Sequence, residues 1–293
     1  MNMMALIGAL PGAAAQGLIW GIMAIGVYIT FRILDIADLT VDGTMCTGGA
    51  VCIMMMLSGH NVWISMLAAT LAGMLAGLAT GIFHTFMGIP AILAGILTQL
   101  SLYSVNLKIM GKANQAINVD KFNLLVSLRR VKGVALTQNT LFIVAIMIII
   151  LIAVLYWFFG TELGCSLRAT GCNPSMSRAQ GINTDRNKVL GLMLSNGLVA
   201  LSGALLTQYQ GFADINMGRG SIVIGLAAVI IGEAIFSRIF RNFALKLLSV
   251  VFGSILYYLV LQIVIWMGID TDLLKMLSAL VVAFFLAFPY WKG

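Results

Sequence analysis

Charged residues are scarce in this sequence. Only 9% of its 293 residues are Asp, Glu, Lys or Arg, whereas 61% are hydrophobic, and a soluble domain is about a quarter charged. This shortage excludes a water-soluble globular protein. Runs such as Leu141–Phe159 and Leu247–Ile269 hold no charge and lack the polar-apolar alternation of membrane barrel strands. The sequence therefore predicts an all-α fold, a polytopic bundle of membrane helices that forms one transmembrane domain over residues 1–293.

The sequence is also short of groups that carry chemistry. It has four cysteines without a C-x-x-C pair and only two histidines, which argues against a zinc site or a disulfide framework. It contains neither the phosphate-binding motif G-x-x-x-x-G-K-[ST] nor the nucleophile motif G-x-S-x-G, so a membrane enzyme is disfavoured. We expect no catalytic residue, no metal site and no cofactor in this chain.

Basic residues outnumber acidic ones by 17 to 10. They occur in short clusters between apolar runs, where they orient helices and meet anionic lipid. The charge therefore indicates a membrane partner and no nucleic acid.

The charge-free runs predict about nine spans. The first is expected to be retained as a helix and not cleaved, because it lacks the basic region with which a signal peptide begins. The seventh is interrupted by Glu233 and is expected to be a broken or partial helix. The nine segments are Ala13–Phe31, Gly43–Gly59, Val62–Phe83, Pro90–Leu107, Leu141–Phe159, Val189–Gln208, Ser221–Phe236, Leu247–Met267 and Leu273–Trp291.

Two stretches of the chain resemble each other. Ala37-Asp38-Leu39-Thr40 leads into a glycine- and alanine-rich run, and Ala213-Asp214-Ile215-Asn216 does the same. With nine spans the two runs point in opposite directions, which predicts an inverted repeat with discontinuous helices and halves of about 13–160 and 161–293. The alternative is that small-residue membrane helices resemble one another because they pack closely.

The polar stretch 160–188 contains signals for a short helix. Asn173-Pro174 begins it, Ser175–Gln180 form it and Gly181 ends it. A short helix between two spans, flanked by glycines and carrying Arg178, is suited to dock on a partner protein.

At this stretch the sequence resembles a known family. T-x-L-G-x-x-x-R-A-x-G-x-N from Thr161, S-R-A-x-G-I-N from Ser177 and S-N-G-L-V-A-L-S-G-A-L from Ser195 are similar to the permeases of bacterial ABC importers for branched-chain amino acids and ribose. Arg32–Val51 and Gly88-Ile89-Pro90-Ala91 extend the resemblance, and within the family the chain looks most like tryptophan and tyrosine importers.

The resemblance implies a transport subunit in the bacterial inner (plasma) membrane. Such a permease passes a small organic solute from an extracytoplasmic binding protein to the cytoplasm. The resemblance to tryptophan and tyrosine importers implies an amino acid here, of the aromatic class. ATP and Mg²⁺ belong to a separate cytoplasmic ABC ATPase, and a second copy of the permease completes a homodimer. The loop 160–188 is then cytoplasmic and Lys108–Thr140 lies outside. The predicted ATPase-coupling residues are Asn173, Pro174, Ser175, Met176, Ser177, Arg178, Ala179, Gln180 and Gly181.

Polar residues near span ends are candidates for the translocation pathway. Each has a structural alternative: Asp38 and Asp42 could cap the helix that begins near Gly43, and Glu233 could pair with Arg238 or Arg241. An ion-coupled secondary transporter is the alternative function, although its coupling ion needs buried carboxylates and the acidic residues here lie at helix ends. The pathway candidates are Asp38, Thr40, Asp42, Thr44, Gln99, Asn216 and Glu233.

Overall fold

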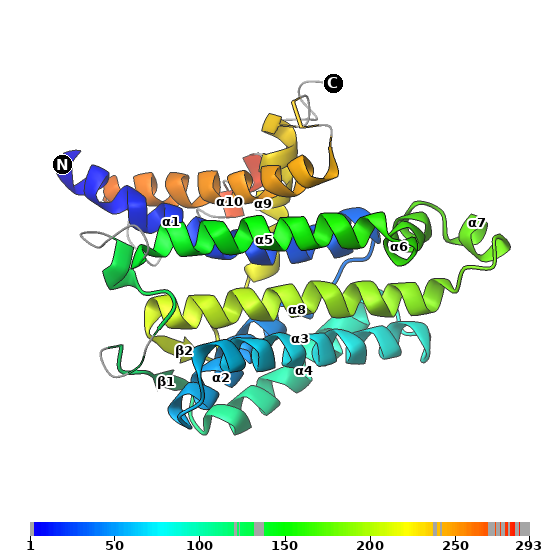
Figure 1. The fold of residues 1–293 in the computed structure, drawn as a ribbon, viewed down its shortest axis with the longest axis horizontal. Helices are drawn as coiled ribbons and strands as arrows, with labels where there is room; N and C mark the ends of the chain where they lie inside the picture. The colour runs from blue at the N-terminus through cyan, green and yellow to red at the C-terminus, as the bar shows by residue number, and fades with distance from the viewer. Residues whose placement is uncertain are drawn as a thin grey trace.

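A computed structural model shows a bundle of membrane helices (Figure 1). It describes residues 3–119, 122, 124–131, 138–236, 239–240 and 242–268, together with 273, 276, 279–280, 282–284 and 287. Within these residues six helices are long and apolar enough to cross a bilayer. They are α1 (Met3–Tyr28, continued by the π-helical turn η1, Ile29–Ile33), α3 (Val62–Thr85), α4 (Ala91–Met110), α5 (Thr140–Gly160), α8 (Thr184–Gln210) and α10 (Phe243–Trp266).

Two shorter apolar helices complete the membrane part that the structure describes. They are α2 (Val41–Leu57) and α9 (Ser221–Phe236), and the bounds of α9 match the predicted broken segment. Eight of the nine predicted segments thus coincide with helices, with ends shifted by several residues. Most of the ninth, Leu273–Trp291, lies outside the described residues, so the count of nine spans stays a prediction.

Helix α8 forms the centre of the bundle, packed against α3, α2 and α1. Glycines allow this close approach. A Cβ atom on Gly73 or Gly77 of α3 would collide with backbone carbonyls of α8, and one on Gly203 of α8 would collide with the carbonyl of Met45. In lipid the hydrophobic effect does not drive helices together, so the close van der Waals packing that small residues allow stabilises such contacts instead.

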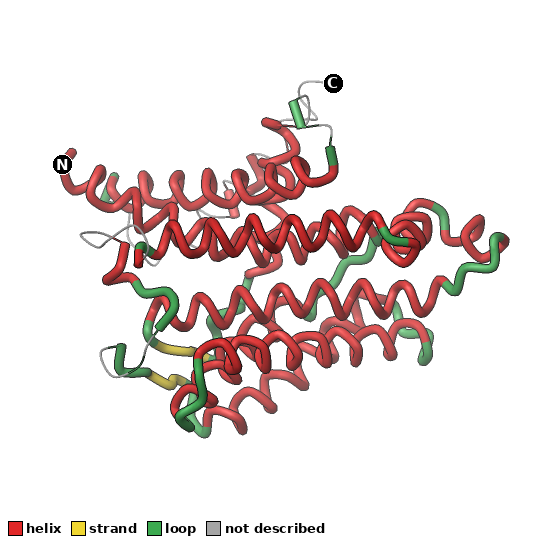
Figure 2. Tube along the Cα trace, viewed as in Figure 1, coloured by secondary structure: helices red, strands yellow, loops and turns green. Residues whose placement is uncertain are grey.

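The two ends of the bundle differ. At one end β1 (Asn114–Ala116) pairs antiparallel with β2 (Phe212–Asp214), with Asn114 opposite Asp214; we call it the strand end. At the other, α6 (Glu162–Cys172) and α7 (Pro174–Ala179) connect α5 to α8, and we call it the α7 end (Figure 2). Neither the strand pair nor α6 was expected from the sequence.

The short helices α2 and α9 meet at their N-termini and run to opposite ends. Asp42 at the start of α2 contacts Ser221 at the start of α9. Helix α2 then leads to the strand end (Figure 1). Helix α9 leads away from it, to where its Glu233 meets Arg32 of η1, which packs on α6. Each follows a similar turn, because the Thr40 amide donates to Asp38 Oδ1 (2.9 Å) and the Asn216 amide to Asp214 Oδ1 (2.7 Å). The inverted repeat and its two halves remain a prediction beyond this local likeness.

Candidate functional site

A buried polar cluster lies where the chain turns into α2. The Asn196 amide of α8 donates to Asp38 Oδ2 at 2.6 Å, and Thr44 Oγ1 donates to Asn196 Oδ1 at 2.7 Å. All three side chains are almost inaccessible to solvent. The cluster holds the connection between η1 and α2 against the central helix. A buried carboxylate needs such partners, since leaving one unpaired is costly.

Threonines extend this cluster sideways. Thr40 Oγ1 lies 2.7 Å from Thr80 Oγ1 of α3, which in turn donates to Thr98 Oγ1 of α4 at 2.9 Å. The sequence predicted Asp38, Thr40 and Thr44 as pathway residues but gave no such prediction for Thr80, Thr98 and Asn196. The available signal was a polar side chain inside a charge-free span, which by itself is a reason to look for a partner.

Asp42 stabilises a different helix from the one expected. It lies in the first turn of α2, but its carboxylate accepts hydrogen bonds from the Gly220 amide (2.9 Å), the Ser221 hydroxyl (2.9 Å) and the Ile222 amide (3.0 Å). Asp42 therefore caps α9 rather than its own helix, where the free amides and the helix dipole favour an anion. The expectation that it caps the helix near Gly43 was wrong.

Asp38 also departs from the expected capping role. Its Oδ1 accepts from the amide of Thr40, the residue before α2, and its Oδ2 from Asn196. It forms a turn and a link to α8 instead of satisfying the first turn of α2. Two further candidates lie apart from this cluster: Gln99 is half-buried on α4, and Asn216 is exposed in the turn that leads into α9.

Glu233 forms an ion pair that the sequence did not indicate. Arg32 Nε lies 2.9 Å from Glu233 Oε1, joining η1 to α9 at the α7 end. The expected partners Arg238 and Arg241 lie outside the described residues. The Arg32 side chain is 56% exposed, so this pair contributes little to stability. It lies at the membrane boundary and not among the buried polar groups.

The predicted short helix is present as α7. Asn173 precedes it and accepts from the Met176 amide at 3.0 Å, Pro174 occupies its first turn, and Gly181 follows with φ +81°. Most of α7 is exposed, and only Ser177 is buried. Arg178 Nε donates to Thr184 Oγ1 at 2.9 Å, which fixes this exposed side chain against the start of α8.

Arg168 connects three helices near α7. Its guanidinium donates to the carbonyl of Phe159 at 3.0 Å and lies 4.4 Å from the ring centre of Phe243. This arrangement satisfies a carbonyl at the end of α5 and makes a cation–π contact with the start of α10. The neighbouring Gly164 and Gly171 allow α6 to approach the backbones of Phe159 and Ile33. The residues around Arg168 thus hold α6 against α5 and α10, and α6 in turn supports α7.

Replacing Arg168 by lysine is expected to loosen this support. An ammonium group cannot both donate to Phe159 and stack flat on Phe243, so we expect a loss of about 1–2 kcal/mol in the free energy of unfolding. Denaturant unfolding of the purified protein in detergent measures it. Arg186→Lys, on an exposed side chain of the same end, is the matched control, and equal stability of both variants would contradict the assignment.

Comparisons with known proteins show which family the sequence matches. The sequence model of the family described as branched-chain amino acid transport system permease component matches residues 10–286. A tyrosine transport system permease protein of Clostridioides difficile is 38% identical over 272 residues, 93% of this chain and 88% of that protein. An autoinducer 2 import system permease protein of Yersinia pseudotuberculosis is 30% identical over 75% of this chain and 60% of that protein.

A solved structure shares the fold. It is a chain of PsaBC from Streptococcus pneumoniae in complex with Fab, matched with a TM-score of 0.55 at 16% identity over 98% of this chain and 95% of that one. At this identity the likeness concerns the arrangement of helices alone.

Proposed function

The chain belongs to the branched-chain amino acid permease family of ABC transporters, and from this premise we propose that it is the membrane subunit of an amino-acid importer. It is a multi-pass protein of the bacterial inner membrane. In this proposal it receives an aromatic amino acid from an extracytoplasmic binding protein and releases it into the cytoplasm. The Clostridioides relative, a tyrosine permease, supports an aromatic substrate.

Energy comes from separate ABC ATPase subunits in this proposal, which also hold the ATP and Mg²⁺. The observation that carries it is α7, a capped and exposed helix held firmly at one end of the bundle. A docking helix transmits force only when its ends are fixed, and Asn173, Gly181 and the Arg178–Thr184 hydrogen bond fix them. The α7 end is then cytoplasmic, and the strand end faces the binding protein.

The pathway in this proposal runs past the meeting point of α2 and α9. Broken helices whose N-termini point into the bundle expose backbone polar groups at mid-membrane. The opposed directions of α2 and α9 support an inverted repeat with halves of about 13–160 and 161–293. Thr40, Thr44 and Asp42 lie at this point, and a second copy of the chain would complete a homodimer.

The test uses Arg178→Glu in proteoliposomes that contain the permease, its ATPase and its binding protein. We expect loss of ATPase assembly and at least a tenfold fall in [³H]tyrosine uptake, because a reversed charge on the docking helix repels the partner groove that accepted the guanidinium. Co-purification of the ATPase and radiolabel uptake are measured on the same preparation.

Arg186→Glu is the control, since it makes the same charge change on an exposed residue of the same end. Normal ATPase binding and uptake by Arg178→Glu would show that α7 is not the coupling helix. Uptake that depends on a proton or sodium gradient without ATP would favour the ion-coupled alternative.

A further inference from the structure

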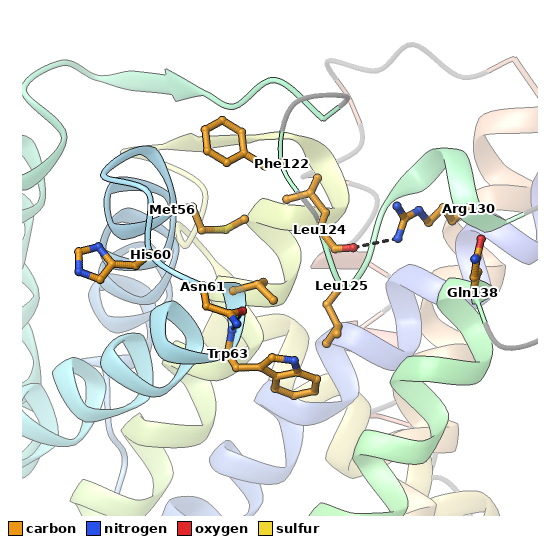
Figure 3. Close-up of a pocket in the computed structure, with 10 residues that line it drawn as sticks. Met56, His60, Asn61, Trp63, Phe122, Leu124, Leu125, Arg130 and Gln138 are labelled. Carbon is orange, nitrogen blue, oxygen red and sulfur yellow. Dashed lines mark hydrogen bonds between the residues drawn. The ribbon is translucent and has the colours of Figure 1, made fainter.

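Two adjoining cavities open on the side of the bundle at the strand end. The upper one, of about 620 Å³, has a mixed lining, in which the polar side chains of His60, Asn61, Arg130 and Gln138 lie among apolar ones (Figure 3); we call it the polar cavity. The lower one, of about 700 Å³, is an apolar groove. Trp63 and Leu125 line both, so the two form a continuous hollow. Each volume lies in the range of ligand sites, roughly 300–1,000 Å³.

The groove follows from how α5 is attached. Helix α5 packs on α1, α6 and α10, whereas α3 packs on α8, α2 and α4. The groove therefore runs along α5 and α8. It is floored by Leu194, Leu198 and Leu201 of α8 and walled by exposed side chains of α5 such as Ile150 and Val154. Its lining is entirely apolar over the membrane-spanning length of α5.

The hollow changes from polar to apolar at the level where the helices enter the membrane. Trp63 lies in the first turn of α3, two residues after its cap Asn61, and α5 begins at Thr140, two residues after Gln138. Tryptophan at a helix start marks the boundary between headgroups and acyl chains. The polar cavity thus lies at headgroup depth and the groove at acyl depth.

The charge of the polar cavity is positive. Arg130 donates through Nη1 to the Leu124 carbonyl at 2.9 Å, which holds its guanidinium at the rim (Figure 3). A guanidinium carries five N–H donors in a fixed fork that suits phosphate. Among the described residues that line the two cavities none is acidic.

We propose that this hollow is a binding site for an anionic phospholipid, with its phosphate on Arg130 and one acyl chain in the groove between α5 and α8. An amphiphile matches both the polarity change and its depth, whereas a helix of a second copy would bring a uniformly apolar surface and leave the cavity at Arg130 unfilled. The site is independent of the transported substrate. A lipid there wedges α5 against α8 and sets the spacing of the two parts of the bundle.

Filling the groove tests the acyl part of the site. The protein is reconstituted in nanodiscs of equal parts phosphatidylglycerol and phosphatidylcholine, released, and analysed by native mass spectrometry. Wild type should retain phosphatidylglycerol, and Ile150→Trp should lose it, because the indole occupies the groove. Ile149→Trp is the matched control: Ile149 is exposed on the same helix but does not line the groove.

Removing the rim charge tests the headgroup part. Arg130→Gln should lower retained phosphatidylglycerol roughly tenfold, the value of one charge-assisted hydrogen bond. Phosphatidylcholine should fall less, because its choline cation already weakens the attraction of its phosphate to a guanidinium. Lys112→Gln removes a charge from an exposed residue of the same end and should change nothing. Equal retention by Ile150→Trp and Ile149→Trp would overturn the proposal. So would a dimer mass lost in Ile150→Trp with lipid unchanged, since a second copy would then cover the groove.

Discussion

Asparagine in place of Asp42 is expected to detach α9 from α2 and to abolish uptake. The carboxylate accepts three hydrogen bonds from the start of α9, and an amide offers one acceptor atom while turning an NH₂ group toward the remaining donors. We expect the free energy of unfolding to fall by roughly 2–3 kcal/mol. Because α2 and α9 diverge from this point, the lost hydrogen bonds are those that fix the position of one helix relative to the other.

Asp35→Asn provides the control for that experiment. Asp35 is an exposed residue of the connection between η1 and α2. Its φ of +55° is a conformation that asparagine tolerates, and the substitution makes the same change in charge and size as Asp42→Asn. Denaturant unfolding in detergent and uptake in proteoliposomes are compared for the two variants. Equal stability and equal uptake of the two variants would mean that the hydrogen bonds between Asp42 and α9 are not required for transport.

The second large effect is expected for Asn196→Leu. Leucine preserves the volume but leaves the buried carboxylate of Asp38 and the buried hydroxyl of Thr44 without the amide that joins them. Each group keeps one hydrogen bond, because the Thr40 amide donates to Asp38 Oδ1 and the Thr40 carbonyl accepts from Thr44 Oγ1. Asp38 Oδ2 is left buried without a donor, which predicts a loss of about 2–3 kcal/mol in the free energy of unfolding. The protein should either fail to accumulate in the membrane or unfold at much lower denaturant concentration.

A double-mutant cycle makes this prediction specific. Asp38→Ala combined with Asn196→Leu removes both partners, which costs less than leaving one of them unpaired. The double variant should therefore be clearly more stable than the sum of the two single losses predicts. Strict additivity would show that the hydrogen bond between Asp38 and Asn196 does not account for the effect.

Features written in adjacent residues could be predicted from the sequence. The limits of α9 followed from the apolar segment after Gly220, which Glu233 interrupts without ending. Helix α7 followed from Asn173-Pro174 and Gly181, because caps and helix ends depend on neighbouring residues. Helix α6 had a comparable signal in Thr161, whose side chain accepts from the Gly164 amide, but its polar composition concealed it among loop residues.

The partners of the site residues could not be predicted in this way. Asp42 bonds to residues about 180 positions later, and Arg32 pairs with Glu233 across 201 positions. Such pairs depend on how the helices pack, and nearer charges such as Arg238 offered a more obvious choice. Thr80 lies in no motif, and Asn196 lies in the motif from Ser195, which indicated the family but not a role for this residue. Only their burial against Asp38 and Thr40 reveals what they do.

The central place of α8 affects the order in which the protein is made. Helices α1, α2 and α3 leave the ribosome before α8, as does the connection that carries Asp38. Until residue 196 reaches the membrane, Asp38 lacks its amide donor, and the glycine-lined face of α3 has no helix to contact. The incomplete chain thus presents a carboxylate and open backbone surfaces to lipid, which is expensive. We therefore expect the incomplete chain to be most sensitive to membrane proteases before α8 is inserted. A chain truncated before α8 should be degraded as a whole, because its earlier helices lack their shared packing partner.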